Sequence, residues 1–418
     1  MAMADAQIVA RGVDTLLLNA FYTDERCQPI KRSLDDALAL RLDGWKKEAQ
    51  EVHDDVSTSL VFNHKILHMC PNGGGRGQWP WMLKSRDLTL YVSRGQWNGI
   101  ATVRLSSEYL WSAGSLHEVL MAVQVFLDEL FHDELYLQVS EVHLCADVAG
   151  WRDIDTLDRR DNFVSRSRKR ATYAVPDWGY DAQVADYTYG LQQTGLDFSH
   201  GGPVAVSIYD KTREIEQSGK EWFADIWCHN GWSEVDGGKV WRVELRLKRE
   251  ALHELRQENA SHEVAFWGVE DAYELPELLP VLWAYGIGSP GGVAGVPDGW
   301  LRCVLPGNDK KRSRWVTHPV WTVVQGAFLA EMAVPEQLGG LVRKRHEQHS
   351  INKGIEAVMG YLTSLAAWAG GELADTTVDL SVVLHWLMTR GDDYLERVGR
   401  DFAAEVQRKR VRFGLQAY

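Results

Sequence analysis

The alternation of side chains in residues 240–250, VWRVELRLKRE, constrains the fold more than any other segment of the chain. Arg242, Glu244 and Arg246 recur at every second position, with apolar residues between them. A period of two is that of a β-strand, so the pattern predicts a strand with one charged face and one apolar face. Such a strand belongs in a sheet whose apolar side is covered.

Three further segments have strand patterns and carry polar residues. Residues 204–210, VAVSIYD, alternate in polarity and run into Lys211, and residues 139–148, VSEVHLCADV, place Asp147 on the polar side. Residues 184–190 end in Tyr187-Thr188-Tyr189-Gly190. If these strands are neighbours with their polar faces together, Asp147 and Glu244 converge, with Asp210 near the edge.

A group of carboxylates is costly unless its members are paired or bind a metal. The oxygen set of Asp147, Glu244 and Asp210 would suit a hard divalent cation, Mg²⁺ or Mn²⁺. A tyrosine hydroxyl beside that ion could attack a phosphodiester, with Lys211 or Arg242 offsetting the developing charge. The alternative for the alternating Arg-Glu-Arg face is a cross-strand ladder of salt bridges.

Composition narrows the class of protein. The chain has 418 residues and a formal net charge of −13, which argues against non-specific coating of nucleic acid but leaves room for local basic patches. The five cysteines are far apart, odd in number and include no CxxC pair, which argues against structural zinc and against a disulfide framework. No apolar run approaches the about 18–20 residues of a membrane span, and the N-terminus is unlike a signal peptide. We therefore expect a cytoplasmic protein with no membrane partner.

Two short segments concentrate positive charge in this acidic chain. Residues 166–170 hold four cations and no anion, whereas the second segment, DKKRSR at 309–314, begins with Asp309. A solvated charged helix is the alternative for the first segment, but concentrated positive charge in an acidic chain is the pattern expected of phosphate contacts, so we predict that both segments bind DNA. The predicted contacts are Arg166, Arg168, Lys169 and Arg170 in the first segment, and Lys310, Lys311, Arg312 and Arg314 in the second.

The order of strand and helix patterns predicts an α+β fold. Residues 1–150 read as strand, helix, three strands, helix and strand, and residues 151–335 as a second sheet-bearing portion. Residues 336–418 read as helices only, after Pro335. We therefore expect two related antiparallel-sheet units backed by helices, 1–150 and 151–335, and a C-terminal all-helical domain, 336–418.

Several short segments, taken together, resemble the plasmid and mobile-element replication initiation factors, which are rolling-circle initiators and the related relaxases of conjugative elements. They are Ala146-Asp147 at a strand end, YTYG at 187–190, IYDKTREI at 208–215 and VWRVELRLKRE at 240–250. WLRCVLP at 300–306 and SRWVTHPVW at 313–321 fit the same pattern. The resemblance extends over most of the chain before the helical C-terminal region.

The resemblance implies a metal-dependent endonuclease that nicks one strand at an origin, keeps a 5′-phosphotyrosine link and leaves a 3′-hydroxyl. If the roles of the family's residues apply to this chain, the resemblance implies that Asp147 and Glu244 hold the metal and that Lys211 and Arg242 contact phosphate. The paired-histidine strand that holds the metal in the larger group of tyrosine nickases is absent from this sequence.

The nicking tyrosine of the family, as aligned, stands two residues before the glycine, where this chain has Thr188. Tyr187 and Tyr189 flank that position and are the candidate nucleophiles. The expected partner is origin DNA, as a single strand or a hairpin at the nick site, with a host helicase and a second copy of the chain as further candidates. The alternatives are a non-catalytic origin-binding protein on the same scaffold and an unrelated α+β protein with salt-bridged strands.

Overall fold

The computed structural model separates the chain into two compact units, Met1–Lys344 and Arg345–Tyr418. Within them the structure describes residues 6–26, 28–75, 78–95, 99–157, 161–166, 184–189, 192–233, 238–258, 264–266, 268–290, 298–331, 341–343, 351–369, 379–404 and 406–407. No helix among these residues is long and apolar enough to cross a membrane.

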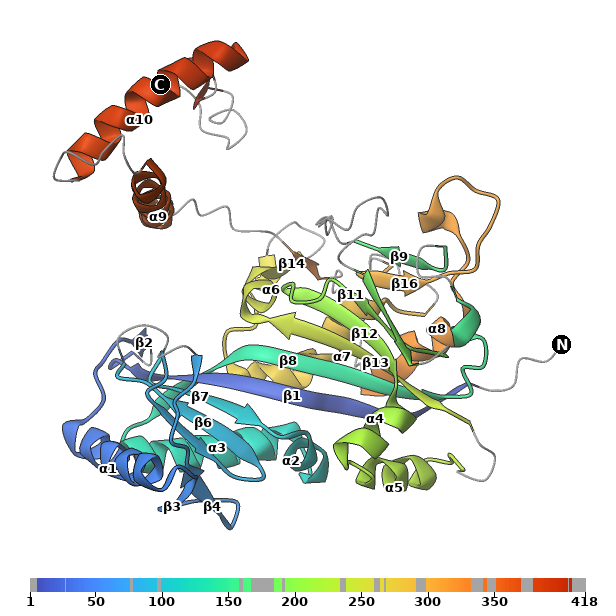
Figure 1. Ribbon diagram of the computed structural model, residues 1–418. Coiled ribbons are helices and arrows are strands. Elements are labelled where there is room, and N and C mark those ends of the chain that lie inside the picture. The colour runs from blue at the N-terminus through green and yellow to red at the C-terminus, as the bar shows by residue number, and fades with distance from the viewer. Residues whose placement is uncertain are drawn as a thin grey trace. The chain divides into compact units, whose positions relative to one another are not determined.

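The larger unit is built on a twelve-stranded sheet in which every strand pair is antiparallel (Figure 1). Its strands run in the order β10 (Val184–Tyr189), β11 (Gln192–Phe198), β12 (Val204–Asp210), β13 (Val240–Lys248), β8 (Leu135–Ala149), β1 (Gln7–Thr23), β7 (Ala101–Leu105), β6 (Leu88–Val92), β5 (Trp81–Lys84), β4 (Lys65–Met69) and β3 (Val56–Phe62), with β2 (Pro29–Ile30) paired to β1.

Two long strands, β1 and β8, join the halves of this sheet. They pair with each other over most of their 17 and 15 residues, and β8 pairs on its other edge with β13. The two sheet-bearing portions expected at 1–150 and 151–335 therefore contribute strands to one continuous sheet. Position 150 lies directly after β8, at the chain crossing from one portion to the other.

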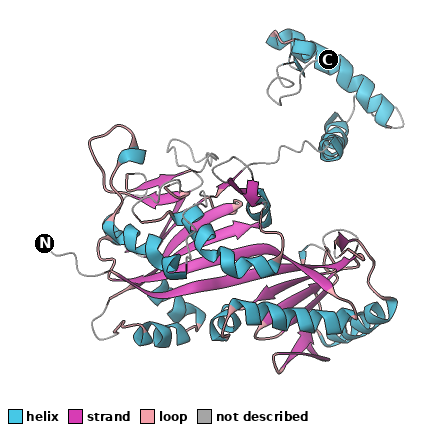
Figure 2. Ribbon diagram, turned by 180° about the vertical axis from the view of Figure 1, so that it is seen from behind, coloured by secondary structure: helices cyan, strands magenta, loops and turns pink. Residues whose placement is uncertain are grey.

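Helices cover both faces of the sheet. The apolar face of the sheet forms the main core, and helices cover it, as the view from behind shows (Figure 2). On this face Gly286 of α7 packs against Leu245 of β13. Phe223 and Trp227 lie on the opposite face, over the polar side of β13 and β8. The helices of this unit are α1 (Asp36–Val52), α2 (Ser107–Ser112), α3 (Leu116–Phe131), α4 (Lys211–Ser218), α5 (Trp222–His229), α6 (Arg249–Glu254), α7 (Leu275–Ile287) and α8 (Pro319–Gln325).

Two small sheets complete the unit. One joins β9 (Phe163–Ser165) to β16 (Leu301–Cys303), and the other joins β14 (Leu255–Glu258) to β15 (Val264–Phe266) and β17 (Val342–Arg343). Residues 342–343, expected in the helical domain, thus pair with β14. Short 3₁₀ turns lie at Ile154–Thr156, Ala272–Glu274, Arg312–Arg314 and Gly326–Glu331.

The smaller unit consists, in its described part, of α9 (Ile351–Ala369) and α10 (Leu380–Val398) and a short helical stretch that follows them. Asp379 caps α10, because its side chain accepts a hydrogen bond from the Val382 amide, and Gly399 ends it in the left-handed conformation. The predicted α+β class with a helical C-terminal region is confirmed.

Candidate functional site

The segments singled out by the sequence lie on five adjacent strands, β10, β11, β12, β13 and β8. Their register forms a single rung across the sheet, in which Tyr187 pairs with Gly195, Gly195 with Tyr209, Tyr209 with Arg242, and Arg242 with Asp147. The register therefore places the polar faces of β13 and β8 on the same side of the sheet, as expected.

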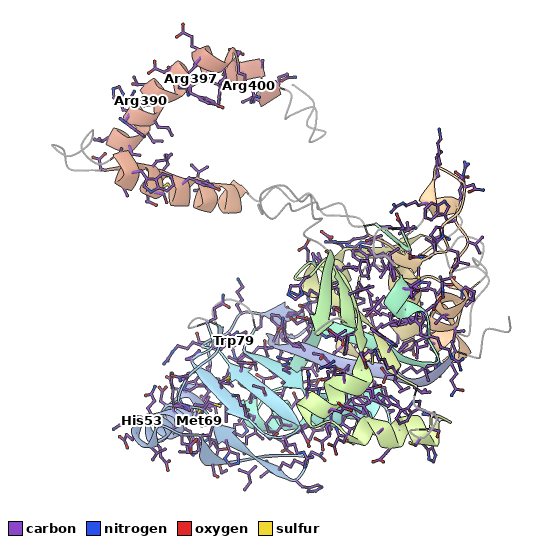
Figure 3. All side chains as sticks on the ribbon, turned by 45° about the vertical axis from the view of Figure 1, so that its right-hand side comes forward. His53, Met69, Trp79, Arg390, Arg397 and Arg400 are labelled. Atoms are coloured by element: carbon purple, nitrogen blue, oxygen red, sulfur yellow. The ribbon has the colours of Figure 1, made fainter. Side chains whose placement is uncertain are left out.

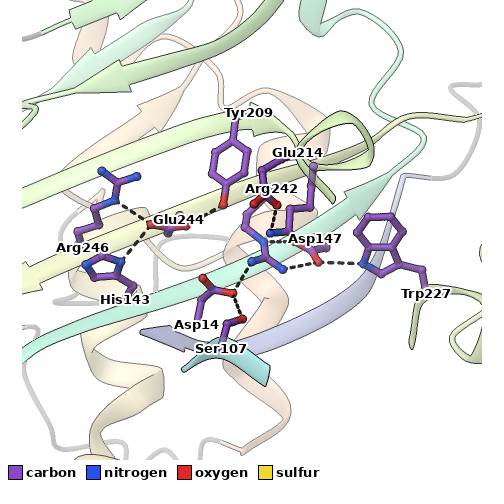
Figure 4. A network of polar contacts seen from close by, with 11 residues as sticks. Asp14, Ser107, His143, Asp147, Tyr209, Glu214, Trp227, Arg242, Glu244 and Arg246 are labelled. Atoms are coloured by element: carbon purple, nitrogen blue, oxygen red, sulfur yellow. Dashed lines mark hydrogen bonds and ion pairs between the residues drawn. The ribbon is translucent and has the colours of Figure 1, made fainter. Parts of the chain in front are cut away.

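The centre of the polar face is an ion pair rather than a carboxylate cluster (Figure 4). The Arg242 guanidinium donates from Nε to Asp147 Oδ1 at 2.6 Å and from Nη2 to Oδ2 at 2.8 Å. Trp227 of α5 donates its indole N–H to Asp147 Oδ2 at 2.9 Å. The Arg242 and Asp147 side chains are both fully buried, so this carboxylate is held entirely by the protein.

Asp14 is the second carboxylate that pairs with Arg242. Nη1 of Arg242 donates to Asp14 Oδ1 at 2.6 Å, and the Ser107 hydroxyl donates to the same oxygen at 2.9 Å. Asp14 lies at a register shift in β1, between Val13 and Thr15, and a bulge of this kind re-aims a side chain. Burial raises the pKa of Asp14, but the charges of Arg242, Lys211 and Lys220 together outweigh it and hold this pKa below its ordinary value.

Glu244 is the centre of a second cluster farther along β13. It accepts hydrogen bonds from the Tyr209 hydroxyl at 2.8 Å and from Arg246 Nε at 2.8 Å, and His143 Nδ1 lies 3.2 Å from its Oε1. Burial raises the pKa of Glu244, yet the hydrogen bond from His143 and the charge of Arg246 outweigh it and hold the pKa far below its ordinary value. Glu244 is therefore a stable anion.

Lys211 is a buried cation at the start of α4. Its ammonium pairs with Glu214 and lies 4.6 Å from the centre of the Phe223 ring, and only 1% of its side chain is exposed. Burial is the main cause that lowers the pKa of Lys211, and the nearby charge of Arg242 adds to it. Phe223 covers Arg242 as well, at 4.4 Å from its guanidinium carbon, so neither predicted phosphate contact reaches the surface in this arrangement.

Asp210 has a local role at the end of β12. Its Oδ1 accepts a hydrogen bond from the Arg213 amide at 3.1 Å and so caps α4, and its Oδ2 lies 3.5 Å from the Lys239 ammonium. A carboxylate at an N-cap satisfies an amide that the helix leaves open and favours the positive end of its dipole. Capping accounts for the acid that directly precedes Lys211.

The three predicted metal ligands do not fit a common divalent-ion site as they stand. Asp147 is committed to Arg242 and Trp227, Glu244 to Tyr209, Arg246 and His143, and Asp210 to its helix cap. A hard cation needs free carboxylate oxygens at about 2.0–2.6 Å, and here each oxygen of Asp147 and Glu244 already accepts from a protein donor. Within the described part of the chain no group of three or more His, Cys, Asp or Glu side chains is arranged to hold a metal ion.

The two candidate tyrosines take different places on β10. Tyr187 belongs to the rung, whereas Tyr189 pairs with Gln192 beyond the stretch of β11 that faces β12. A register shift separates Tyr187 from Thr188. Sequence reasoning could not see this shift, which changes the relation of the two tyrosines to the neighbouring strands.

The basic segments flank the small β9–β16 ladder. Arg166 follows β9, and its amide bonds to the Trp300 carbonyl next to β16. Lys310, Lys311, Arg312 and Arg314 lie on the exposed loop that leaves the other end of β16. Arg166 and the loop therefore lie at opposite ends of the ladder. Arg168, Lys169 and Arg170 lie outside the described residues.

This ladder packs on the face of the sheet opposite the polar network. Phe163 of β9 contacts Phe198 of β11, with ring centres 5.0 Å apart. Phe198 alternates with Asp197, whose carboxylate accepts from Ser207 on the polar face. The basic loop and the Arg242 network are therefore reached from different sides of the sheet.

Sequence reasoning missed several members of the network. Asp14 and Trp227 hold the Arg242–Asp147 pair, and Tyr209 holds Glu244. A lone acid in the apolar segment GVDTLLLN was the available signal for Asp14, because an acid in an apolar strand requires a partner.

No protein-family model matches this chain, and no curated protein sequence matches it. Among solved structures, it is similar to a rolling-circle replication initiator protein from Geobacillus stearothermophilus, with a TM-score of 0.36 and 12% sequence identity over 77% of this chain and 96% of that chain. With so low a score, function has to be inferred from the residues of this chain.

Proposed function

We propose that this chain is a DNA-binding replication initiator of the rolling-circle type, which nicks one strand at an origin through a tyrosine. The observation that carries the proposal is the rung that joins Tyr187, Tyr209, Arg242 and Asp147 across adjacent strands. Each of these residues comes from a different segment of the sequence resemblance, and the register brings the segments together.

Tyr187 is the preferred nucleophile. It shares the rung with Tyr209 and Arg242, whereas Tyr189 lies beyond it. Tyr209 itself is unsuited to attack, because its hydroxyl is committed to Glu244, and burial, with the charge of Glu244, raises the pKa of this phenol well above its ordinary value. Tyr209 serves instead to hold Glu244 in place.

The proposed step balances without a metal ion. The phenol oxygen forms a bond to the scissile phosphorus, the bond from phosphorus to the 3′-oxygen breaks, and the phenol proton leaves while the 3′-oxygen gains one. A 5′-phosphotyrosine and a 3′-hydroxyl result. Arg246 and Lys248, partly exposed on the polar face of β13, would hold backbone phosphates of a strand laid over the sheet. Arg242 and Lys211 are buried below this surface and would act by holding the strands of the rung in position.

The basic loop supports a DNA partner. Lys310 and Lys311 are exposed, and Arg312 stacks near the Trp315 ring at 5.6 Å. Because this loop lies on the other side of the sheet, it would contact a stretch of DNA separate from the nick site. A host helicase as a further partner stays a prediction.

A non-catalytic origin-binding protein is the second candidate function. The observation that favours it is the commitment of Asp147 and Glu244 to protein donors, which makes the polar network a structural element of the sheet. Mg²⁺ or Mn²⁺ would then have no part in the activity.

The discriminating experiment uses a supercoiled plasmid that carries the cognate origin, with Mg²⁺, with Mn²⁺ or with a chelator. We expect nicked plasmid with protein attached to the 5′ end, and loss of that product in Tyr187→Phe. Tyr91→Phe, on β6, is the matched control and should nick as the unaltered chain does. Origin binding without nicking under every condition would establish the second candidate and reject the first.

A further inference from the structure

The loop that follows β16 is a hairpin, residues 305–316, which projects beyond β9 and β16 in orange in Figure 1. Val304 and Thr317 form a β-bridge at its base. One step further, the Leu305 amide donates a hydrogen bond to the Val316 carbonyl at 2.8 Å. Residues that stand opposite each other in an antiparallel pair point to the same face, so Leu305 and Val316 are neighbours on one face of the hairpin. Leu305 is 39% exposed and Val316 is 70% exposed, so this apolar pair faces solvent.

Contacts around the tip of the hairpin hold its shape. The Trp315 indole N–H donates to the Asp309 carbonyl at 2.7 Å, and the Asp309 carboxylate accepts from the Lys311 amide at 2.8 Å. Arg302, which is buried in β16, donates to the Ser313 carbonyl at 2.7 Å. Because these contacts fix the hairpin before a partner arrives, little conformational entropy is lost when it binds one.

Positive charge is concentrated on this hairpin, and Figure 3 shows side chains standing out from it. In a chain whose net charge is −13, it holds one acid, Asp309, and four cations, Lys310, Lys311, Arg312 and Arg314. Arg312 pairs with Asp161 at 2.8 Å and Arg314 with Asp309 at 3.3 Å, and each of these side chains is at least 40% exposed. Exposed ion pairs contribute little to stability, so both arginines can exchange a carboxylate for a phosphate. The hairpin therefore suits a polyanion.

A second hairpin has the same apolar geometry without the charge. Val61 of β3 and Ile66 of β4 stand opposite each other and are 52% and 49% exposed. The neighbouring Lys65 pairs with the buried Asp87. Exposed apolar side chains are ordinary on a protein surface, so an apolar pair alone indicates no partner. The four cations beside the pair are what distinguish the 305–316 hairpin, and they indicate that its partner is negatively charged.

We propose that the 305–316 hairpin is a second DNA site, separate from the nick site, in which Leu305 and Val316 cover the faces of unpaired bases. The inference rests on the proposed function for its DNA partner. The four cations bind phosphates of any DNA, because their attraction to the backbone carries no information about the bases. Base faces are apolar and are hidden in the stack of an intact duplex, so an exposed apolar pair gains contact only where the bases are open. The pair thus gives the hairpin a preference for melted DNA.

The test compares the affinity of the full-length chain for a labelled duplex with its affinity for the same duplex containing a central run of mismatched bases, by fluorescence anisotropy at low salt. The mismatched duplex should bind about tenfold more tightly, the effect expected for burying one apolar side chain of this size. Leu305→Ser and Val316→Ser should each reduce this ratio severalfold and leave the affinity for the intact duplex unchanged. Val61→Ser and Ile66→Ser, at the matched pair on β3 and β4, should leave both affinities unchanged.

The outcomes separate this inference from the proposed function. Equal affinity for the two DNAs, or an unchanged preference in either serine variant at the hairpin, would overturn the inference while DNA binding and nicking stand. No binding to either DNA would reject the proposed function itself. Vesicles of phosphatidylserine and phosphatidylcholine probe a membrane surface, the other partner that takes cations beside apolar side chains. Binding to these vesicles that is lost in Val316→Ser, without a preference for the mismatched DNA, would also overturn the inference.

Discussion

Arg242 of β13 and Asp147 of β8 face each other across neighbouring strands in a two-pronged ion pair from which water is excluded. Removing two charges from water costs several kcal/mol for each, and the pair offsets this only through its geometry and its additional donors. Here Asp14 and Trp227 supply those contacts. The pair thus fixes which residues of β8 and β13 stand opposite each other.

Asp147→Asn should strongly destabilise the larger unit, because it leaves the Arg242 charge buried with only Asp14 to balance it. Breaking a buried pair in this way costs about 3–5 kcal/mol, measured as the free energy of unfolding in urea. Glu51→Gln is the matched control, since its pair with Lys47 is exposed at 3.9 Å and should cost less than about 1 kcal/mol. A cost for Asp147→Asn as small as that of the control would show that Arg242 is stabilised elsewhere.

His143 should make the stability of the sheet depend on pH near neutrality. Its two ring nitrogens lie 2.7 Å from Glu141 and 3.2 Å from Glu244. Burial lowers the pKa of His143, but the hydrogen bonds to these carboxylates outweigh burial, and the pKa is raised above its ordinary value. A group with a raised folded-state pKa stabilises fully below its unfolded pKa, and this stabilisation is lost as pH rises through the folded-state pKa.

The measurement compares the unaltered chain with His143→Gln by urea unfolding at a series of pH values. The difference in unfolding free energy should be largest below about pH 6.5 and should shrink as the pH rises above it. His68→Gln, partly exposed on β4 and away from the buried carboxylates, serves as control and should leave the pH profile unchanged. A difference that grows as the pH rises would contradict a protonated His143 between the two carboxylates.

The faces of the central strands could be predicted from the sequence, but their pairing could not. Period-two alternation correctly placed Arg242, Glu244 and Asp147 on a shared polar side. A slip of two residues between β8 and β13 would keep every side chain on the same face, so alternation cannot decide whether Asp147 meets Arg242 or Glu244. If Asp147 meets Arg242 the result is an ion pair, and if it meets Glu244 the result is a pair of acids that could share a metal ion.

Local irregularities were also beyond sequence reasoning. The bulge at Asp14 and the register shift after Tyr187 depend on how whole strands align. Gly195 of β11 borders the second shift, but a single glycine in a strand pattern does not fix the register of its neighbours. Asp210 is different, since an acid just before a helical pattern is a recognisable N-cap. The expectation that the polar faces of these strands coincide, with Asp210 near their edge, favoured the metal interpretation over the cap.

DNA binding through the basic loop should appear in the dependence of affinity on salt. Lys310→Ala and Lys311→Ala should each weaken binding to any DNA sequence and reduce the slope of log affinity against log salt by about 1. Lys47→Ala, on the exposed side of α1, should leave the slope unchanged. A fall in affinity confined to one DNA sequence would point to base reading by the loop, and no binding at low salt would favour an unrelated α+β protein.

Gly286→Ala should destabilise the packing of α7 on the sheet beneath the network. An added Cβ would lie 2.9 Å from Cγ of Leu245 and closer still to both its methyl groups, and because Leu245 is fully buried, its side chain would have to shift within a packed core. Overpacking of this kind costs about 1–3 kcal/mol. Gly44→Ala in α1 is the matched control, because nothing lies within 4 Å of its added Cβ and the exchange should stabilise by up to about 1 kcal/mol.

Since Leu245 follows Glu244 on β13, a shift of this strand in Gly286→Ala should also disturb the Tyr209–Glu244 hydrogen bond, which a lowered Tyr209 pKa would reveal by ultraviolet titration. An unchanged stability would mean that α7 and β13 separate easily.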